Sequence, residues 1–209
     1  MGASADRRVV NLPSIALWQS YFTKAHIYGL DISDCGAFQN DRFTFLHADC
    51  GDPIALRRAA QQGVMFDVII DDGSHASYHQ QQTLLELFTT LRPGGLYIIE
   101  DLHWQPPAYE GSLPYVPKTS ALLMGLDNLL EANAASVIAY ARWEDLRNKI
   151  ESITPYTNDQ IYQNAYVPPR RRLRLALRRA RQGLRRSIGL RVRTSEHLVK
   201  LIVIKKKTH

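Results

Sequence analysis

Two short apolar runs in this chain each end in acidic residues, and together they constrain the fold more than any other feature. Residues 66–72 read Phe-Asp-Val-Ile-Ile-Asp-Asp, and residues 96–101 read Leu-Tyr-Ile-Ile-Glu-Asp. A short apolar run bounded by turn residues is typical of a buried strand in a parallel sheet. The stretch between them, 75–91, has helical spacing and is followed by Arg-Pro-Gly-Gly. This pattern predicts a strand–helix–strand unit whose two parallel strands end at the same edge of a sheet.

That edge is where we expect a binding site. Ligands of open α/β sheets bind beyond the carboxyl ends of the strands. The predicted unit brings the acidic side chains of Asp71, Asp72, Glu100 and Asp101 to this edge, together with the imidazole of His75. The sequence therefore predicts a site for a small molecule or a metal ion.

The rest of the chain continues the alternation of strands and helices. This order favours an α/β fold with a mostly parallel sheet. Residues 103–117 are rich in proline and aromatic side chains. This composition predicts a loop that covers the sheet edge where the binding site is expected and contacts the substrate there. The last two strands should pair as a terminal antiparallel hairpin. The expected strands are 26–32, 43–49, 149–156 and 198–206, and the expected helices are 13–22, 53–62 and 119–132.

Length and composition indicate an ordinary globular domain. The 209 residues suit one domain, 1–209, with a full hydrophobic core. No apolar run reaches the roughly 18–20 residues that a membrane span needs. The amino terminus lacks the apolar core of a secretory signal, so Cys35 and Cys50 are expected to be free thiols and the protein cytoplasmic.

The net charge of +6 comes from one segment. Residues 170–193 contain eleven arginines and no acidic residue, and the remainder of the chain is mildly acidic. Leucines at helical spacing make this segment a basic amphipathic helix, within a predicted insertion at 157–195. Such a helix suits an anionic membrane surface, which would place the protein at the inner face of the membrane. Packing on its own domain or in a homo-oligomer is the alternative. Nucleic acid is the least favoured partner, because the segment lacks aromatic residues for stacking.

Three stretches carry a resemblance to a known family. Residues 27–32, 67–75 and 91–102 resemble the metal-dependent sugar O-methyltransferases that use S-adenosylmethionine, which are related to the cephalosporin hydroxylase group. The resemblance covers about residues 14–101 well and the last strand weakly. It implies a Rossmann-like class I methyltransferase domain with helices on both faces of the sheet. It also implies transfer of a methyl group to a hydroxyl of a sugar or glycosylated product, assisted by Mg²⁺.

The resemblance also implies roles for individual residues. Three carboxylates form a hard oxygen site suited to Mg²⁺, and a neutral imidazole beside it would take the proton of the acceptor hydroxyl. His75 would be this general base. The implied metal ligands are Asp72, Glu100 and Asp101, and the implied cofactor-binding residues are Asp31, Asp49 and Asp71, with Asp52 as a weaker candidate.

Three side chains near this edge keep two interpretations each. His103 and Trp104 would line the acceptor pocket or would simply pack the proline-rich loop. His79 lies one helical turn after His75, and a surface or packing role is expected for it.

The chain departs from the family pattern at its start. Such methyltransferases open with a strand that ends in a glycine-rich turn, which lets the backbone approach the cofactor closely. Residues 9–14 read Val-Val-Asn-Leu-Pro-Ser and contain no glycine, so we expect the first strand to be short or missing. The alternative function is therefore a truncated or degenerate, non-catalytic methyltransferase-like module.

Overall fold

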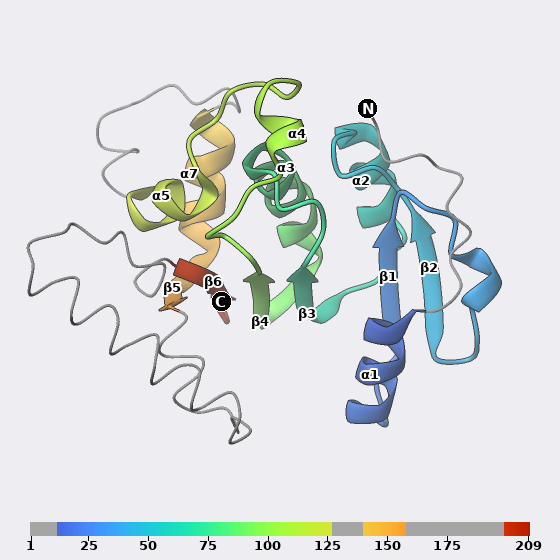
Figure 1. The fold of residues 1–209 in the computed structure, drawn as a ribbon. Helices are drawn as coiled ribbons and strands as arrows, with labels where there is room; N and C mark the ends of the chain where they lie inside the picture. The colour runs from blue at the N-terminus through green and yellow to red at the C-terminus, as the bar shows by residue number, and fades with distance from the viewer. Residues whose placement is uncertain (1–11, 127–139, 158–198) are drawn as a thin grey trace, which may run out of the picture.

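The computed structural model describes residues 12–126, 140–157 and 199–209. Strands and helices alternate as far as β4, and an antiparallel hairpin follows, as predicted (Figure 1). The strands are β1 (Ile27–Asp31), β2 (Phe43–His47), β3 (Phe66–Asp71), β4 (Leu91–Ile99), β5 (Ile150–Thr157) and β6 (Val199–Lys206). The helices are α1 (Pro13–Tyr21), α2 (Pro53–Ala60), α3 (Ser77–Leu87), α4 (Pro107–Glu110), α5 (Thr119–Met124) and α7 (Tyr140–Lys149).

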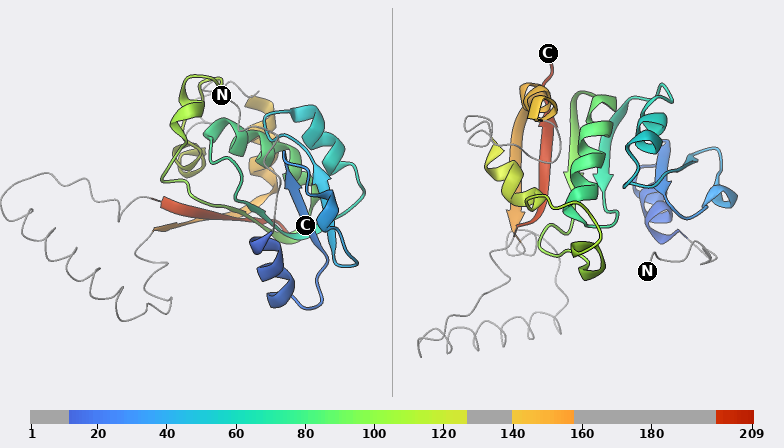
Figure 2. Two further views of the ribbon diagram at one scale, coloured as in Figure 1. Left: turned by 45° about the vertical axis from the view of Figure 1, so that its right-hand side comes forward. Right: turned by 90° about the horizontal axis from the view of Figure 1, so that it is seen from above.

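The predicted α/β class is confirmed, but the described strands form two sheets instead of one. β1 and β2 pair in parallel, and the second sheet has the order β3-β4-β6-β5. β3 and β4 are parallel, whereas β6 pairs antiparallel with both of its neighbours. Helices α2, α3 and α7 lie along one side, and α1 packs against β1 on the other (Figure 2).

The hydrophobic core lies almost wholly beside the four-stranded sheet. Its fully buried members come mainly from α3, the 3-10 turn Phe88–Thr90, β4, α7 and the hairpin strands β5 and β6, and the largest is Trp143. Helix α7 was not predicted, because only a few of its residues are apolar; Trp143 and Leu146 bury it against the core. By contrast, α1 and β1 contain no buried residue. The two halves of the fold are therefore packed very unequally.

Strand β4 begins earlier than the sequence predicts. Residues 92–95, expected to be a turn, lie within it, and Leu91 already pairs with Phe66. Gly94 has a φ of 77°, and a Cβ at Gly95 would stand 2.9 Å from the carbonyl oxygen of Arg92 and 3.0 Å from that of Asp67. The two glycines thus let the strands approach closely where the register shifts.

Some predictions fall outside the described residues. These are nearly all of the insertion 157–195, its arginine-rich part 170–193, and the start of the possible first strand at 9–14. Helix α5 ends at Met124, and the remainder of the predicted helix 119–132 lies mostly beyond the described range. Within the described ranges, no helix is long and apolar enough to cross a membrane.

Candidate metal and catalytic site

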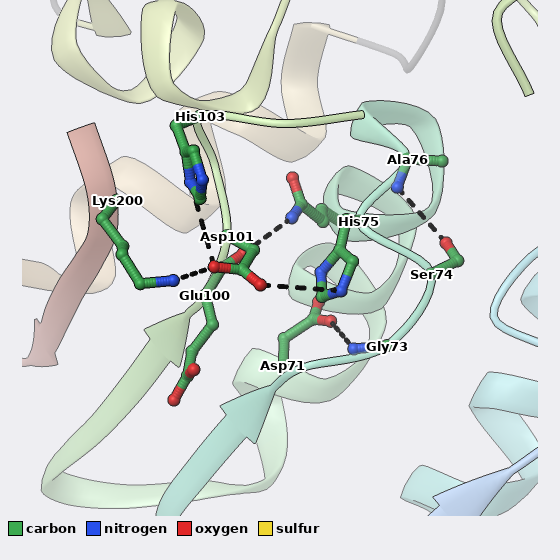
Figure 3. A network of polar contacts seen from close by, with 10 residues as sticks. Asp71, Gly73, Ser74, His75, Ala76, Glu100, Asp101, His103 and Lys200 are labelled. Atoms are coloured by element: carbon green, nitrogen blue, oxygen red, sulfur yellow. Dashed lines mark hydrogen bonds and ion pairs between the residues drawn. The ribbon is translucent and has the colours of Figure 1, made fainter. Parts of the chain in front are cut away.

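The acidic ends of β3 and β4 lie side by side, as the sequence predicts. Asp71 pairs with Ile99, and the amide of Glu100 donates a hydrogen bond of 3.0 Å to the carbonyl oxygen of Asp71. The residues that follow each strand therefore leave the sheet together, at the edge shown in Figure 3.

Two residues at this edge have unusual backbones. His75 has a φ of 59° and Asp101 a φ of 52°, and no other non-glycine residue in the described ranges has a positive φ. This left-handed conformation costs roughly 1–2 kcal/mol for a residue with a Cβ. Ser74 Oγ accepts a hydrogen bond from the amide of Ala76, and the amide of Leu102 donates to the carbonyl oxygen of Lys200. Strained residues that the surrounding structure holds in place cluster at functional sites.

Three ligand atoms converge between the two turns. One atom each of Asp72, His75 and Asp101 lies within 4.8 Å of the other two. The Nε2 atom of His75 is 4.0 Å from Oδ2 of Asp101. Two carboxylates and an imidazole so close together form a donor set that fits a small divalent cation.

Glu100, the third predicted ligand, is not part of this group. Its carboxylate points away from Asp101 and His75 (Figure 3). Glu100 nevertheless lies close enough to the site for the charges there to shift its pKa. Burial and then the negative charge of Asp72 raise this pKa, while the positive charge of Lys200 lowers it. A different side-chain rotamer would be needed for Glu100 to join the other two carboxylates.

Lys200 was not predicted to be part of the site. Its Nζ donates a hydrogen bond to Oδ1 of Asp101, from strand β6 (Figure 3). Burial raises the pKa of Asp101, but the hydrogen bond and charge of Lys200, with smaller contributions from His75 and His103, outweigh it and leave that pKa below its ordinary value. A positive charge thus already lies against one carboxylate of the site.

The loop after β4 covers one side of His75. The ring of Trp104 meets that of His75 edge-on at 5.8 Å, and Nδ1 of His103 lies 3.8 Å from Oδ1 of Asp101. The Nδ1 atoms of both histidines are buried without a hydrogen-bond partner in the described structure. Two polar atoms without a partner beside an acidic cluster are unusual and favour a site that takes a ligand. His103 and Trp104 thus lie beside the acidic cluster, and their role in an acceptor pocket stays a prediction.

The predicted cofactor residues lie at the carboxyl ends of β1, β2 and β3. Asp31 and Asp49 are exposed, and Oδ1 of each accepts a hydrogen bond of 2.7 Å, from the amides of Ser33 and Gly51 respectively. Asp52, the weaker candidate, caps α2 by accepting a hydrogen bond of 2.8 Å from the amide of Ile54.

Asp71 faces the protein interior. Burial raises its pKa to about 6, against hydrogen bonds from the amide of Gly73 and the hydroxyl of Tyr97, each 3.4 Å long. Burial, and secondly the charge of Asp71, raise the pKa of Cys50 to about 11. Both cysteines are free thiols. The raised pKa keeps the Cys50 thiol protonated, so Cys50 is a poor nucleophile.

His79 packs between the loops that follow β2 and β3. Its Nδ1 lies 2.7 Å from Ser74 Oγ, and its ring meets Tyr109 edge-on at 5.2 Å. A Cβ at Gly51 would stand 3.0 Å from its Nε2, so this glycine makes room for the imidazole. The packing role expected for His79 matches this position, whereas a surface role does not.

Comparisons with known proteins point to one class of enzyme. No family model matches the chain. The 8-demethyl-8-α-L-rhamnosyl tetracenomycin-C 2'-O-methyltransferase of Streptomyces olivaceus is 39% identical over 110 residues, which are 51% of this chain and 29% of that protein. Demethylmacrocin O-methyltransferase of Streptomyces fradiae is 43% identical over 89 residues, 43% of this chain and 22% of that protein. Mycinamicin VI 2''-O-methyltransferase of Micromonospora griseorubida is 36% identical over 122 residues, 57% of this chain and 30% of that protein.

A solved structure has the same fold. The MycE methyltransferase of the mycinamycin biosynthetic pathway, in complex with Mg, SAH and mycinamycin VI, superposes with a TM-score of 0.59 at 22% identity. The superposition covers 98% of this chain and 43% of MycE. The chain thus matches less than half the length of this neighbour and under a third of each curated relative. Its homologues are sugar O-methyltransferases, and its fold is that of a class I methyltransferase.

Proposed function

We propose that this chain is an S-adenosylmethionine-dependent, Mg²⁺-assisted O-methyltransferase domain, 1–209, that acts on a hydroxyl of a sugar or glycosylated small molecule. The observation that supports it most is the convergence of Asp72, His75 and Asp101 on strained turns at one sheet edge. Relatives named for methylating rhamnosyl and macrolide sugars, and a neighbour solved with Mg and SAH, support the same reaction.

The acidic residues have the role of holding the cation. Asp72 and Asp101 already face a common point, and Glu100 would complete the set by rotation of its side chain. When bound, Mg²⁺ would increase the acidity of the sugar hydroxyl and S-adenosylmethionine would supply the methyl group.

His75 has the role of general base. Its imidazole is mostly buried, and Nε2 is directed toward the acidic cluster at 4.0 Å from Asp101. A neutral imidazole in this position would accept the proton of the acceptor hydroxyl as its oxygen attacks the methyl group. The ring of Trp104 packs edge-on against the imidazole at 5.8 Å.

The cofactor would lie along the ends of β1 to β3. There, Asp31 would accept hydrogen bonds from ribose hydroxyls, and Asp49 would contact the adenine. One carboxylate oxygen of each accepts a hydrogen bond within its own turn, and the other would contact the ligand. Asp71 would hold the loop at residues 72–74 in place by accepting a hydrogen bond from the amide of Gly73.

Methyl transfer to a rhamnosylated tetracenomycin, with labelled S-adenosylmethionine and Mg²⁺, tests the proposal. His75→Ala should lower turnover by about a hundredfold or more, the usual contribution of a positioned base, with Mg²⁺ affinity retained. His26→Ala is the matched control, because His26 bonds Thr44 at the amino end of β1, far from the site. Equal turnover in the His75 variant and the wild type would refute the role of base. Absence of both turnover and S-adenosylmethionine binding in the wild type would favour the non-catalytic module.

Calorimetric titration with Mg²⁺ tests the metal site separately. Lys200 presents a positive charge to Asp101, so Lys200→Met should bind Mg²⁺ about threefold to tenfold more tightly. Lys205→Met is the control, since Lys205 lies on the same strand but pairs with Glu151 at 2.8 Å. If both variants bind Mg²⁺ with the affinity of the wild type, the cation does not bind beside Asp101.

The arginine-rich segment 170–193 is proposed to attach the protein peripherally to an anionic membrane surface, at the cytoplasmic face. Its charge and leucine spacing in the sequence support this proposal. Deletion of 170–193 should abolish pelleting with phosphatidylserine vesicles; pelleting that persists would exclude the segment as the anchor. A concentration-dependent change in mass that disappears with the deletion would instead support the homo-oligomer.

A further inference from the structure

His79, in the first turn of α3, lies where three segments of the candidate site meet. Its Nδ1 atom is 2.7 Å from Oγ of Ser74, in the loop between β3 and α3. Its Nε2 atom lies 3.0 Å from the position that a Cβ at Gly51 would take, in the loop after β2. Its ring meets that of Tyr109, in α4, edge-on at 5.2 Å. One imidazole thus connects the segments that follow β2, β3 and β4.

The side chain of His79 has little freedom to move. The residue is only 7% exposed, and Oγ1 of Thr83 donates a hydrogen bond of 2.9 Å to its carbonyl oxygen. The ring is confined by Tyr109 on one side and by the backbone at Gly51 on another. A hydrogen bond to a group that is itself held in place restricts the partner more than a bond to a mobile group. Nδ1 of His79 is therefore a fixed point to which the neighbouring loop attaches.

Ser74 forms a turn around His75. Its Oγ accepts a hydrogen bond of 3.3 Å from the amide of Ala76, two residues further on (Figure 3). The residue enclosed by this turn is His75, whose φ of 59° is left-handed. A turn made by a serine hydroxyl is weak, because the side chain can rotate among three staggered positions. The contact with His79 selects the rotamer that bonds Ala76.

We propose that His79 is a positioning residue for the reaction: it fixes the Ser74 hydroxyl, which in turn holds His75 with its imidazole directed at the acidic cluster. His79 is not one of the three residues whose ligand atoms converge, so it acts through Ser74. The role rests on the proposed function, because it takes His75 to be the base. The hydrogen bond and the turn themselves depend on geometry alone.

The same ring links the base to the loop after β2. Nε2 of His79 and Oδ1 of Asp49 lie 3.0 Å and 3.2 Å from the same point, the position of a Cβ at Gly51. Asp49 is also close enough for its charge to act on the imidazole. Since the ring cannot yield freely, a small shift of this loop would press on it and, through Ser74, on the turn around His75.

Two substitutions at position 79 separate positioning from packing. Asparagine puts an amide near the place of Nδ1 that can donate or accept, whereas leucine fills more of the volume but forms no hydrogen bond. We expect His79→Asn to keep kcat within about threefold and His79→Leu to lower it about tenfold, with the KM of the acceptor nearly unchanged. The reverse order would show that the ring only fills space and would overturn the proposal.

Exchange of the Ala76 amide with solvent, measured by NMR on the full chain, gives a readout that needs no turnover. It should be about tenfold faster in His79→Leu than in the wild type, and near the wild-type rate in His79→Asn. Thr83→Val is the matched control, because it removes a hydroxyl from the same helix, one turn further on, and leaves Ser74 untouched. Equal exchange at residue 76 in the two His79 variants would mean that His79 does not hold the turn.

Ser74→Ala tests the intermediate step. It should lower kcat as much as His79→Leu does, and the double variant should lose no more, because both changes remove the same hydrogen bond. Losses that add up in the double variant would contradict a role exerted through Ser74.

Gly51→Ala tests the link from the other loop. The added methyl would lie 3.0 Å from Nε2 of His79, so exchange at Ala76 should become faster. The effect should disappear when His79→Asn is also present, since asparagine has no atom at the place of Nε2. Gly111→Ala, where no atom lies within 4 Å of the added methyl, is the control. Unchanged exchange in Gly51→Ala would refute the link to the loop after β2.

The two readouts distinguish this proposal from the proposed function. If the wild type transfers no methyl group but exchange at Ala76 follows the expected order, His79 holds the turn and the proposed function fails. If the wild type is active and His79→Leu is equally active, the proposed function stands and the positioning role fails.

Discussion

At the scale of single residues, the site depends on backbone conformations that its residues do not prefer. His75 and Asp101 hold left-handed φ values that glycine adopts at no steric cost. The chain nevertheless has an imidazole and a carboxylate there, which face each other. This loss of stability is expected if the proposed reaction needs these two groups.

This strain predicts an opposition between stability and activity at position 75. His75→Gly relieves the left-handed conformation, whereas His75→Ala keeps it, so the glycine variant should have the higher free energy of unfolding by about 1 kcal/mol. Neither variant should transfer methyl groups. Urea denaturation of both proteins measures the difference. An alanine variant at least as stable as the glycine variant would mean that the backbone at 75 is not strained.

His79 predicts a dependence of stability on pH. Burial lowers its pKa below the usual 6.5, with Asp49 opposing. The unfolded chain therefore binds a proton at His79 more readily than the folded one, so stability is lost as pH falls below 6.5.

His79→Asn removes this titration and retains a hydrogen-bond partner for Ser74. The fall in the free energy of unfolding between about pH 7.5 and 5.5 should then be smaller than in the wild type. Urea denaturation at several pH values gives this slope, with His26→Asn as control. The same slope in the His79 variant and the wild type would contradict the prediction.

At the scale of elements, the loops after β3 and β4 and the strand β6 position the groups of the site. The loop at 72–76 connects β3 to α3 and brings His75 back toward Asp101, and β6 adds Lys200 from the far end of the chain. The adjacency of β3 and β4 in turn depends on the glycines at the start of β4. There the backbone carbonyls of Arg92 and Asp67 leave no space for a side chain at Gly95.

Gly95→Ala should therefore destabilise the protein. A methyl group at this position would meet two backbone oxygens at 3.0 Å or less, and the backbone must shift to admit it. We expect a loss of about 1–3 kcal/mol in the free energy of unfolding. Gly111→Ala, where no atom lies within 4 Å of the added methyl, should change stability by less than about 0.5 kcal/mol. Equal stability of the two variants would show that the close approach at Gly95 is unimportant.

At the scale of the whole molecule, the two sheets differ in how firmly they are packed. The main hydrophobic cluster contains residues of α3, β4, α5, α7 and both hairpin strands, and none of α1, β1 or β2. The half that would hold the ribose and adenine of the cofactor therefore has the smaller core.

This asymmetry predicts where the native protein opens first. Amides of β1 and β2 should exchange with solvent at least about tenfold faster than those of β4 and β6, because opening them exposes little apolar surface. Native-state hydrogen exchange of the wild type measures both sets. Equal protection of the two sheets would mean that they unfold as one unit.

The sequence by itself determined the strand–helix–strand unit and the adjacency of its acidic ends, because these follow from local apolar periodicity and from the right-handed connection of parallel strands. Tertiary structure alone decided which side chains meet. Lys200 reaches Asp101 across 99 positions of the chain, and the Glu100 carboxylate turns away from its neighbour. The sequence also could not show that β1 and β3 stand apart, since both have the composition of interior strands. Strand pairing and side-chain direction depend on neighbours that come together only in the folded chain, so local pattern leaves them undetermined.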